Sequence, residues 1–170
     1  MARKVLYCLL MAALLFSLAA CGKNAEEKKM EKTTEKMIEQ SSGGKVKVDL
    51  SQEQIKIKDQ HGEAVISAKG NVQIPNDFPK DVYVHPNTKV LIAQTVDGGF
   101  HVLLESAEDP EPLVNTYKGK MKTDGWKETN AISMGATGII TYEKDNRRAM
   151  VTISQSEKGK TGIQLQIHKK

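Results

Sequence analysis

The stretch KVLIAQTVDGGFHVLLESAEDPEPLVNTYKGKMKTDGW, residues 89–126, decides the fold of this chain. Apolar and polar residues alternate over 90–96 and again over 100–104, which is typical of strands that bury one face. Between them, Asp97-Gly98-Gly99 is a strong signal for a hairpin turn. The first part of the stretch therefore predicts two antiparallel strands.

The second part of the stretch predicts an amphipathic helix. Residues 106–109 offer cap residues, and prolines occupy two of the next three positions, where a first helical turn accepts them. Gly125 ends the helix, and we expect Trp126 to fold back onto the last turn near Met121. The apolar face of this helix supplies the candidate ligand-facing side chains, Leu113, Tyr117 and Met121.

Four further strands are expected after the helix, over residues 126–134, 139–144, 149–155 and 163–168. In the last of them Ile163, Leu165 and Ile167 alternate with polar residues, so one face is buried and the other is in water. We therefore predict an α+β fold, an antiparallel β-sheet with one main helix packed on one face, in the order β-β-α-β-β-β-β.

Two segments precede this pattern. Residues 45–73 alternate in three short runs and predict a small β-meander, whose buried face must be covered by the preceding helix or by the main domain. Residues 74–86 hold three prolines, which exclude a helix and a central strand. We expect them to form an extended belt that inserts Phe78, Val82 and Val84 and begins an α+β domain over 74–170.

Residues 21–44 are charged and poor in large apolar groups. Oppositely charged residues three to five positions apart suit a solvated helix, and Ser41-Ser42-Gly43-Gly44 stops it. We interpret the segment as a tether, flexible or partly helical. The alternative is that its thin apolar stripe, Met30, Met37 and Ile38, docks on the domain or on another protein.

The N-terminus has the order of a secretory signal peptide over residues 1–20, with a basic start and an apolar run. The run is about 16 residues, short of the roughly 20 that a membrane-spanning helix needs. Leu18, Ala19, Ala20 and Cys21 resemble the lipobox of bacterial lipoproteins, which implies signal peptidase recognition at 18–20 and lipid attachment, with palmitate, at Cys21. The resemblance implies a cell envelope location, and Gly22 favours the outer membrane, facing the periplasm, in a host with two membranes.

The net charge and the cysteine content limit which partners, disulfides and metal sites this chain can have. Without the signal peptide the formal charge falls from +4 to +2, which gives no concentrated basic face for nucleic acid. Cys8 lies in the signal peptide and Cys21 is expected to carry lipid, so neither a disulfide nor a cysteine metal site is available. We expect no cofactor and no metal.

Local signatures of catalysis do not occur. No Gly-x-Ser-x-Gly or His-Glu-x-x-His pattern is found, and we expect the chain not to be an enzyme. His85 and His101 border the first two main strands, but a metal site needs a third ligand, and we interpret both as surface histidines. The basic residues near the later hairpin tips are interpreted as solvated turns, or alternatively as a contact with acidic cell-surface polymers.

From Gly43-Gly44 to the C-terminus the chain resembles uncharacterised small bacterial envelope lipoproteins. The resemblance rests on the belt at 74–86, the hairpin and the helix that ends in Gly125-Trp126, and it brings no catalytic or binding residues. The helix and sheet are also similar in architecture to the helix-grip modules of the lipoprotein attached to the outer-membrane β-barrel assembly machine.

Three functions remain open. The first is a lipid-anchored, non-catalytic module that binds or supports an envelope protein or a cell-surface polymer, through the uncovered sheet face. The second is a small-ligand module with its site between the helix at 110–124 and the sheet. The third, an envelope hydrolase, needs two convergent carboxylates or a histidine pair.

Overall fold

The computed structural model describes residues 24–51, 53–157 and 159–170. The expected signal peptide at 1–20, with Leu18, Ala19 and Ala20, and the lipid-bearing Cys21 lie outside the described residues. The chain divides into two units, 1–30 and 31–170, and the second unit contains the whole β-sheet. No helix within the described residues has both the length and the apolar character needed to cross a bilayer.

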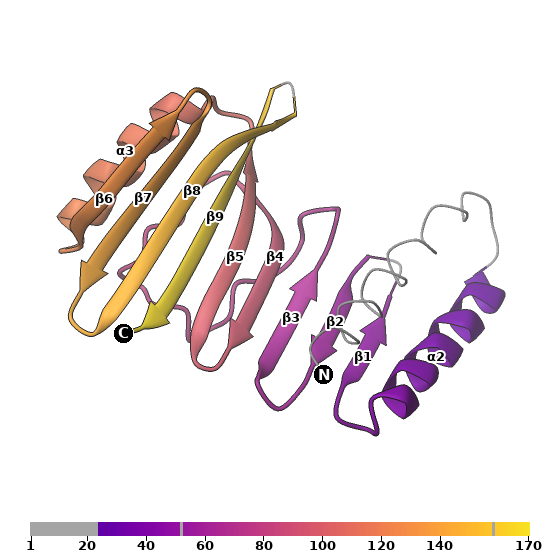
Figure 1. The fold of residues 1–170 in the computed structure, drawn as a ribbon. Coiled ribbons are helices and arrows are strands. Elements are labelled where there is room, and N and C mark those ends of the chain that lie inside the picture. Colours follow the sequence, from indigo (N-terminus) through magenta and orange to yellow (C-terminus); the bar gives the residue numbers. More distant parts are fainter. Residues whose placement is uncertain (1–23, 52, 158) are drawn as a thin grey trace. The chain divides into compact units, whose positions relative to one another are not determined.

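The described residues form two helices and nine strands (Figure 1). Their bounds are α2 Asn24–Ser41, β1 Lys47–Leu50, β2 Ile55–Lys58, β3 Gly62–Ile66, β4 Lys89–Val96, β5 Gly99–Ser106, α3 Pro110–Thr123, β6 Lys127–Met134, β7 Thr137–Lys144, β8 Arg147–Glu157 and β9 Lys160–Lys169. The strands make one sheet in the order β1-β2-β3-β4-β5-β9-β8-β7-β6, and each neighbouring pair is antiparallel. The predicted α+β class with an antiparallel sheet is confirmed.

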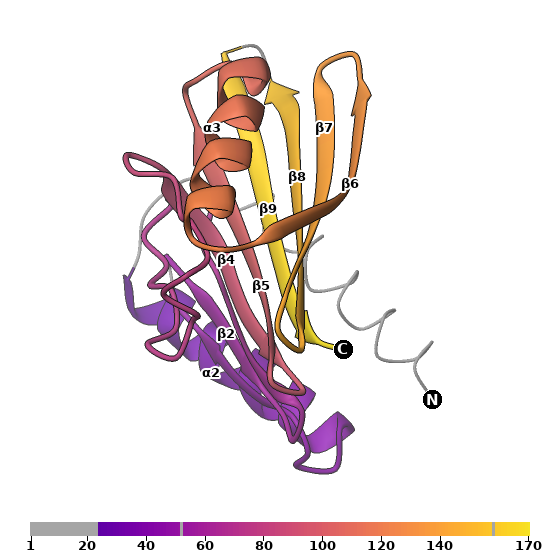
Figure 2. The same cartoon turned by 90° about the vertical axis from the view of Figure 1, so that its left-hand side faces the viewer.

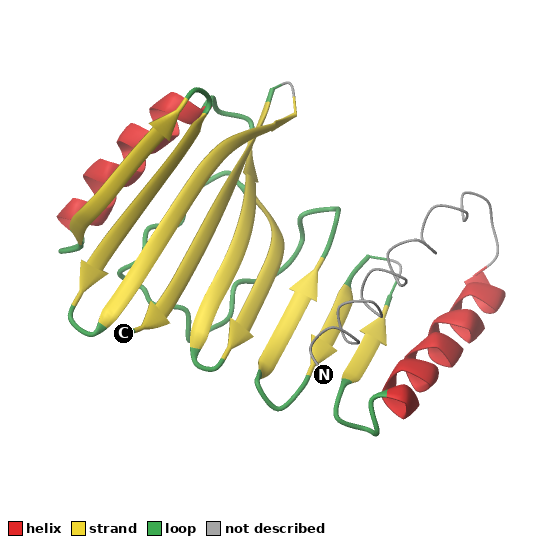
Figure 3. Cartoon of the chain, viewed as in Figure 1, coloured by secondary structure: helices red, strands yellow, loops and turns green. Residues whose placement is uncertain are grey.

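The sheet continues across the boundary that the sequence suggested between residues 73 and 74. β3 pairs with β4 from Gly62 opposite Val96 to Ile66 opposite Ile92, so the meander and the later strands share one sheet. Without β3, β4 would present an unpaired edge to solvent, and pairing removes that exposed row of backbone groups. The connection between them, residues 67–88, is drawn as loop in Figure 3.

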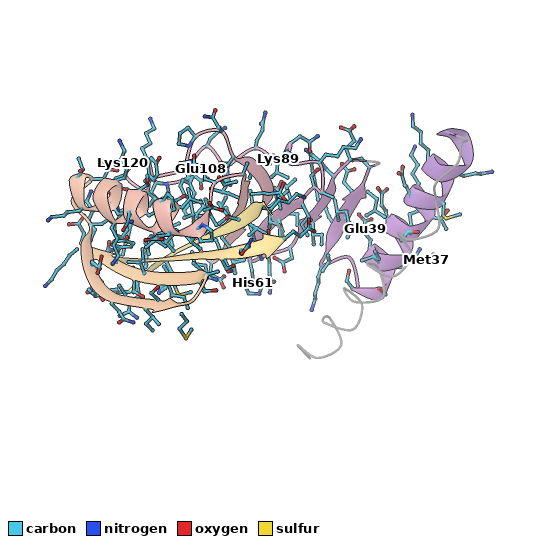
Figure 4. The ribbon with its side chains drawn as sticks, turned by 90° about the horizontal axis from the view of Figure 1, so that it is seen from above. Met37, Glu39, His61, Lys89, Glu108 and Lys120 are labelled. Carbon is cyan, nitrogen blue, oxygen red and sulfur yellow. The ribbon has the colours of Figure 1, made fainter. Side chains whose placement is uncertain are left out.

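One face of the sheet carries the core, and α3 lies on that face (Figures 2 and 4). In β9 the buried residues are Thr161, Ile163, Leu165 and Ile167, while the residues between them stay partly exposed. α3 contacts β6, β7 and β8. The alternation in the sequence therefore sets the two faces, and the helix covers the apolar one.

The turn of the predicted hairpin and the C-terminus of the predicted helix adopt the backbone conformations that their residues favour. Asp97 and Gly98 have φ of 48° and 75°, the two positive values of a type I′ turn, so that β4 and β5 pair tightly. At the end of α3, Gly125 has φ of 83°, and the Trp126 amide donates to the Met121 carbonyl at 2.9 Å. This is a Schellman cap, and the predicted return of Trp126 onto the last turn is confirmed.

The proline-rich belt covers the part of the core that α3 leaves open. Phe78 and Val82 belong to the buried cluster and Val84 packs against it, as the sequence predicted. The indole Nε1 of Trp126 donates to the Asp81 carbonyl at 2.6 Å and so fixes the belt beside the end of α3. The belt is thereby tied to the same residue that caps the helix.

The tether is helical over the described residues 24–41. Ile38 is half-buried, whereas Met37 is exposed. The Glu35 carboxylate accepts the Leu50 amide of the edge strand β1 at 2.6 Å. A side chain of α2 therefore satisfies a backbone donor that the sheet edge would otherwise leave to solvent.

Candidate functional site

A groove of about 530 Å³ runs between α3 and the β6–β7 hairpin. α3 contributes Lys118, Gly119 and Lys122 to its lining. Its remaining wall and floor come from Trp126, Lys127, Glu128 and Tyr142. The site thus combines aromatic surface with a rim of charged side chains.

The groove lies where α3 meets the β6–β7 hairpin, whose outer strand β6 is exposed. Every residue of β6 is exposed. Near the start of the strand its register with β7 shifts between Glu128 and Asn130. At Gly138 of β7, by contrast, the helix approaches so closely that a Cβ would lie 2.6 Å from Val114 Cγ2. The hollow lies between the close contact at Gly138 of β7 and the exposed start of β6.

Tyr142 is the buried polar group of the site. Its side chain is 1% exposed, lies on the helix side of β7 and lines the groove. No donor or acceptor in the described part of the chain is within hydrogen-bond reach of its hydroxyl. Burial, with a smaller effect of the Glu128 charge, raises the pKa of the Tyr142 hydroxyl above its ordinary value, so it stays protonated. A buried hydroxyl without a partner is costly, and because protein atoms cover its oxygen, a group from outside would bond it only after the lining side chains shift.

Three lysines stand around the groove. Lys118 Nζ lies 3.9 Å from a Glu128 carboxylate oxygen. Within the described residues, no carboxylate comes within 4 Å of Lys122 or Lys127. The groove is therefore net positive at its rim.

The residues predicted to face a ligand do not line this groove. Leu113, Tyr117 and Met121 are fully buried in the core cluster. Tyr117 packs edge-on against Tyr83, with ring centroids 5.1 Å apart. No described group is in hydrogen-bond geometry with its hydroxyl, and burial, partly opposed by the nearby His85 backbone, raises the pKa of Tyr117. The apolar face of α3 thus makes core, and the neighbouring face makes the groove.

Sequence reasoning missed Gly119, Trp126 and Tyr142 as groove residues. A glycine inside an amphipathic helix was the available signal, because glycine weakens a helix interior. Tyr142 gave none, since a tyrosine in an alternating strand is ordinarily a core residue.

The interpretation of His85 as a surface residue is wrong. His85 is 8% exposed, its Nδ1 lies 3.2 Å from the Tyr83 hydroxyl, and its Nε2 lies 2.9 Å from a Glu108 carboxylate oxygen. The belt turns the ring inward because these two polar partners satisfy both of its nitrogens. His101 is half-buried on β5, where its Nε2 pairs with Gln164 at 2.8 Å, and burial lowers its pKa. The two histidines have different partners, and the described residues contain no cluster of three His, Cys, Asp or Glu that would hold a metal.

The basic residues at the hairpin tips are mostly ion-paired with carboxylates. Lys144 and Arg147 each lie 2.7 Å from Asp81 Oδ2, and Lys170 lies 2.6 Å from Glu143. Lys160 approaches Glu105 at 3.4 Å. Most of the described tip cations therefore have a carboxylate within the domain, although Lys144 and Arg147 share Asp81, and Arg148 and Lys170 share Glu143.

A second hollow of about 610 Å³ lies over β2–β4, beside residues 71–77. Its side chains are mainly carboxamides and charged groups, and Gln54 Nε2 already donates to the Asn71 carbonyl at 3.1 Å. The described residues of this hollow include no buried polar atom left without a partner. The groove beside α3 is therefore the stronger candidate.

Comparison with known proteins gave one match, to a family model. Residues 88–161, less than half of the sequence, match a family model described as START domain-like. The match begins just before β4 and ends at the start of β9, so it includes α3 and every residue of the groove. No curated protein and no solved structure matches the chain.

Proposed function

We propose that this chain is a membrane-anchored binding module that takes a small, largely apolar ligand with a hydrogen-bond acceptor in the groove between α3 and the β6–β7 hairpin. The observation that carries the proposal is the Tyr142 hydroxyl, which is buried in the groove lining and has no partner among the described residues. The START domain-like match over residues 88–161 favours a ligand-binding module.

The size and lining of the groove suit this role. Its volume of about 530 Å³ falls within the roughly 300–1,000 Å³ of small-molecule sites. The lining includes two aromatic residues, Trp126 and Tyr142, which are 2% and 1% exposed. The phenol then fixes the orientation of the ligand through one hydrogen bond.

We propose a binding rather than a catalytic role. The Tyr142 phenol, held protonated by burial, is a poor base and a poor nucleophile at neutral pH. A hydrolase would need convergent carboxylates or a histidine pair, and in the described structure His85 and His101 have separate partners.

Anchoring is the second part of the proposal. Leu18-Ala19-Ala20-Cys21 supports cleavage before Cys21 and its modification by lipid, which would place the module at the cell envelope, on the periplasmic side of the outer membrane in a host with two membranes. Cys21→Ser should release the protein from membranes and abolish incorporation of an alkyne-labelled palmitate. Unchanged membrane binding and labelling of this variant would contradict the anchor.

Ligand binding is tested at Gly119. Gly119 lines the groove, and a Cβ at this position would meet no atom within 4 Å, so a phenylalanine can be placed at the groove wall without a clash. The chain has a single tryptophan, Trp126, and it lines the groove, so its emission reports binding directly. Titration with dodecanol should shift this emission in the natural protein and leave it unchanged in Gly119→Phe.

The matched control is Lys120→Phe. Lys120, labelled in Figure 4, is the next residue of α3. Its Nζ lies 5.9 Å from the Tyr83 ring centroid, and the residue does not line the groove. This variant should keep the emission shift. Equal binding by all three proteins, or binding by none, would contradict the proposed site.

A second candidate function is the support of another envelope component through the sheet. Ile132 and Met134 of β6 are 44% and 63% exposed, and by strand alternation they lie on the face opposite α3. Crosslinking in intact cells should capture one defined partner, and Ile132→Lys should abolish the product. A protein that stays solitary under saturating crosslinker would contradict this role.

A further inference from the structure

We propose that the sheet face opposite α3 is the contact surface of a homodimer, in which β2, β3, β4, β5, β9 and β8 of two copies pack face to face. The inference goes beyond the proposed ligand site, because α3 and its groove lie on the other face of the sheet. Three features of the described residues carry it: a centre without charge, an arrangement that complements itself, and sufficient area.

The strand registers align two rows of side chains across this face. The residues of the first row lie opposite one another on consecutive strands and are Ile55, Ile66, Ile92, Leu103, Gln164 and Thr152. The second row lies two residues away along each strand and consists of Ile57, Ala64, Gln94, His101, Gln166 and Met150. In β5, β9 and β8 these residues alternate with core residues, so both rows lie on the face opposite α3. Every member of the two rows is half-buried.

The two rows are free of charged side chains. Neither contains Asp, Glu, Lys or Arg, although these residues make up 27% of the chain. His101 adds little positive charge at neutral pH, because burial lowers its pKa. The charged residues of this face lie beyond the rows and pair with one another: a Glu105 carboxylate oxygen lies 3.4 Å from Lys160 Nζ, and a Glu143 carboxylate oxygen lies 3.1 Å from Arg148. An uncharged centre with ion pairs around it is the usual anatomy of a protein–protein contact.

The order of residues within the rows favours a second copy as the partner. In β2, β3 and β4 the rows are aliphatic except for Gln94, whereas in β9 both positions are glutamines. A twofold axis along the rows would place each strand on the same strand of the other copy. Aliphatic side chains would then meet aliphatic side chains, and the glutamines of β9 would meet glutamines, whose amides both donate and accept. No charge in the contact would lose its partner, so the same surface suits both sides.

The area of this face is sufficient for a dimer. Six strands at a spacing of about 4.8 Å are about 29 Å wide, and strands that average about seven residues are about 23 Å long. The face therefore offers about 650 Å² per copy, or about 1,300 Å² in the pair, which lies within the roughly 1,200–2,000 Å² of specific interfaces. The Glu35 contact brings α2 to the edge strand β1, outside these six strands.

The test uses the full chain, with a different C-terminal affinity tag on each of two co-expressed copies, extracted in a mild detergent. Purification through one tag should recover the other, and sedimentation should give the mass of two copies. Ile66→Glu and Thr152→Arg each place a charge in the centre of the face, and a twofold dimer contains each charge twice. Because the contact would strip water from these unpaired charges, we expect self-association to weaken at least about tenfold in each variant.

Val65→Glu is the matched control. Val65 is the neighbour of Ile66 in β3, is also half-buried, and points to the opposite face of the sheet. This variant should self-associate as the natural protein does. Trp126 belongs to the core on the α3 side, so unchanged Trp126 emission reports that each variant is folded.

Crosslinking locates the contact without charged variants. A short bismaleimide should join two copies of Thr152→Cys, whose new thiol lies in the first row. It should not join copies of Lys120→Cys, because Lys120 is exposed on α3, on the other side of the sheet (Figure 4). This result stands whether or not the charged variants fold.

Several outcomes would overturn the dimer. The mass of a single copy at about 100 µM would do so, because a specific contact of this size should be populated there. Self-association that survives both charged variants, or that Val65→Glu weakens equally, would place the contact elsewhere. Capture of a different protein on this face while the copies stay solitary would also overturn it. The ligand titration with Gly119→Phe probes the other side of the sheet, so the dimer and the proposed function fail separately.

Discussion

Replacing Asp81 with asparagine tests how the belt is held on the sheet. Asp81 Oδ1 and Oδ2 accept from Arg147 at 2.8 and 2.7 Å, and Lys144 Nζ lies 2.7 Å from Oδ2. The side chains of Asp81, Arg147 and Lys144 are 28%, 23% and 25% exposed, so water screens these contacts only in part. The carboxylate joins the belt to the turn between β7 and β8.

The size of the expected stability loss in Asp81→Asn follows from these contacts. Hydrogen bonds to charged groups contribute about 1.5–3 kcal/mol each when buried, and partial exposure reduces the value for the network. We therefore expect Asp81→Asn to lower the free energy of unfolding by about 2 kcal/mol, since an amide keeps one acceptor but loses the charge. In a domain of this size that corresponds to a fall of roughly 4–8 °C in Tm.

The pH dependence has a definite sign. The hydrogen bond from Arg147, opposed by burial and assisted by Lys144, holds the pKa of the Asp81 carboxyl well below its ordinary value of 3.8. Because the folded-state pKa is depressed, the contribution is complete above about pH 5 and is lost as the pH falls through the acid range. The stability difference between the natural protein and Asp81→Asn should therefore shrink below about pH 4.

Urea denaturation at several pH values measures this difference. Asp77→Asn is the control, because Asp77 lies on the same belt, is exposed and has no ion pair within the described residues. It should change stability by less than about 0.5 kcal/mol at every pH. Equal effects of the two substitutions, or a deficit in Asp81→Asn that grows as the pH falls, would refute the reasoning.

Three further substitutions probe the helix, the groove and the sheet edge. Gly138→Ala places a Cβ 2.6 Å from Val114 Cγ2 and should lower the free energy of unfolding by about 1–3 kcal/mol. Adding Val114→Ala should restore part of this loss in thermal denaturation, and no recovery would contradict the contact. Tyr142→Phe removes a buried hydroxyl without a partner, so the free energy of unfolding should stay the same or rise by up to about 1 kcal/mol, while dodecanoate binding should weaken. A lower free energy of unfolding would indicate that the hydroxyl has a partner inside the protein. Glu35→Gln weakens the acceptor of the Leu50 amide and should increase hydrogen exchange at that amide, and unchanged exchange would contradict the edge contact.

Local chemistry explains what the sequence predicted well. The hairpin at residues 97–99 and the return of Trp126 depend on backbone conformations that few residues adopt, so the residues themselves are the signal. Alternation in β9 predicts its buried face because the period of a strand is two. Prolines in the belt likewise exclude regular structure without reference to the rest of the chain.

Features that depend on distant partners were not predictable in the same way. The junction of β3 with β4 requires two segments separated by the belt to meet, and alternation is the same for either pairing. His85 is buried because Tyr83 and Glu108 come together around it, and Glu108 is far from it in the sequence. The groove combines α3 with Tyr142 of β7, so the apolar stripe of α3 alone pointed to the core instead.

The central claim, that a ligand occupies the groove between α3 and the β6–β7 hairpin, is tested most directly by photo-crosslinking. A dodecanoate analogue with a diazirine in its chain is irradiated with the protein, and the adducts are mapped by mass spectrometry of peptides. The account predicts adducts on residues 118–128 or on Tyr142, suppressed by excess dodecanoate and absent in Gly119→Phe. Adducts confined to the other hollow, at residues 54–77, or spread evenly along the chain would contradict it.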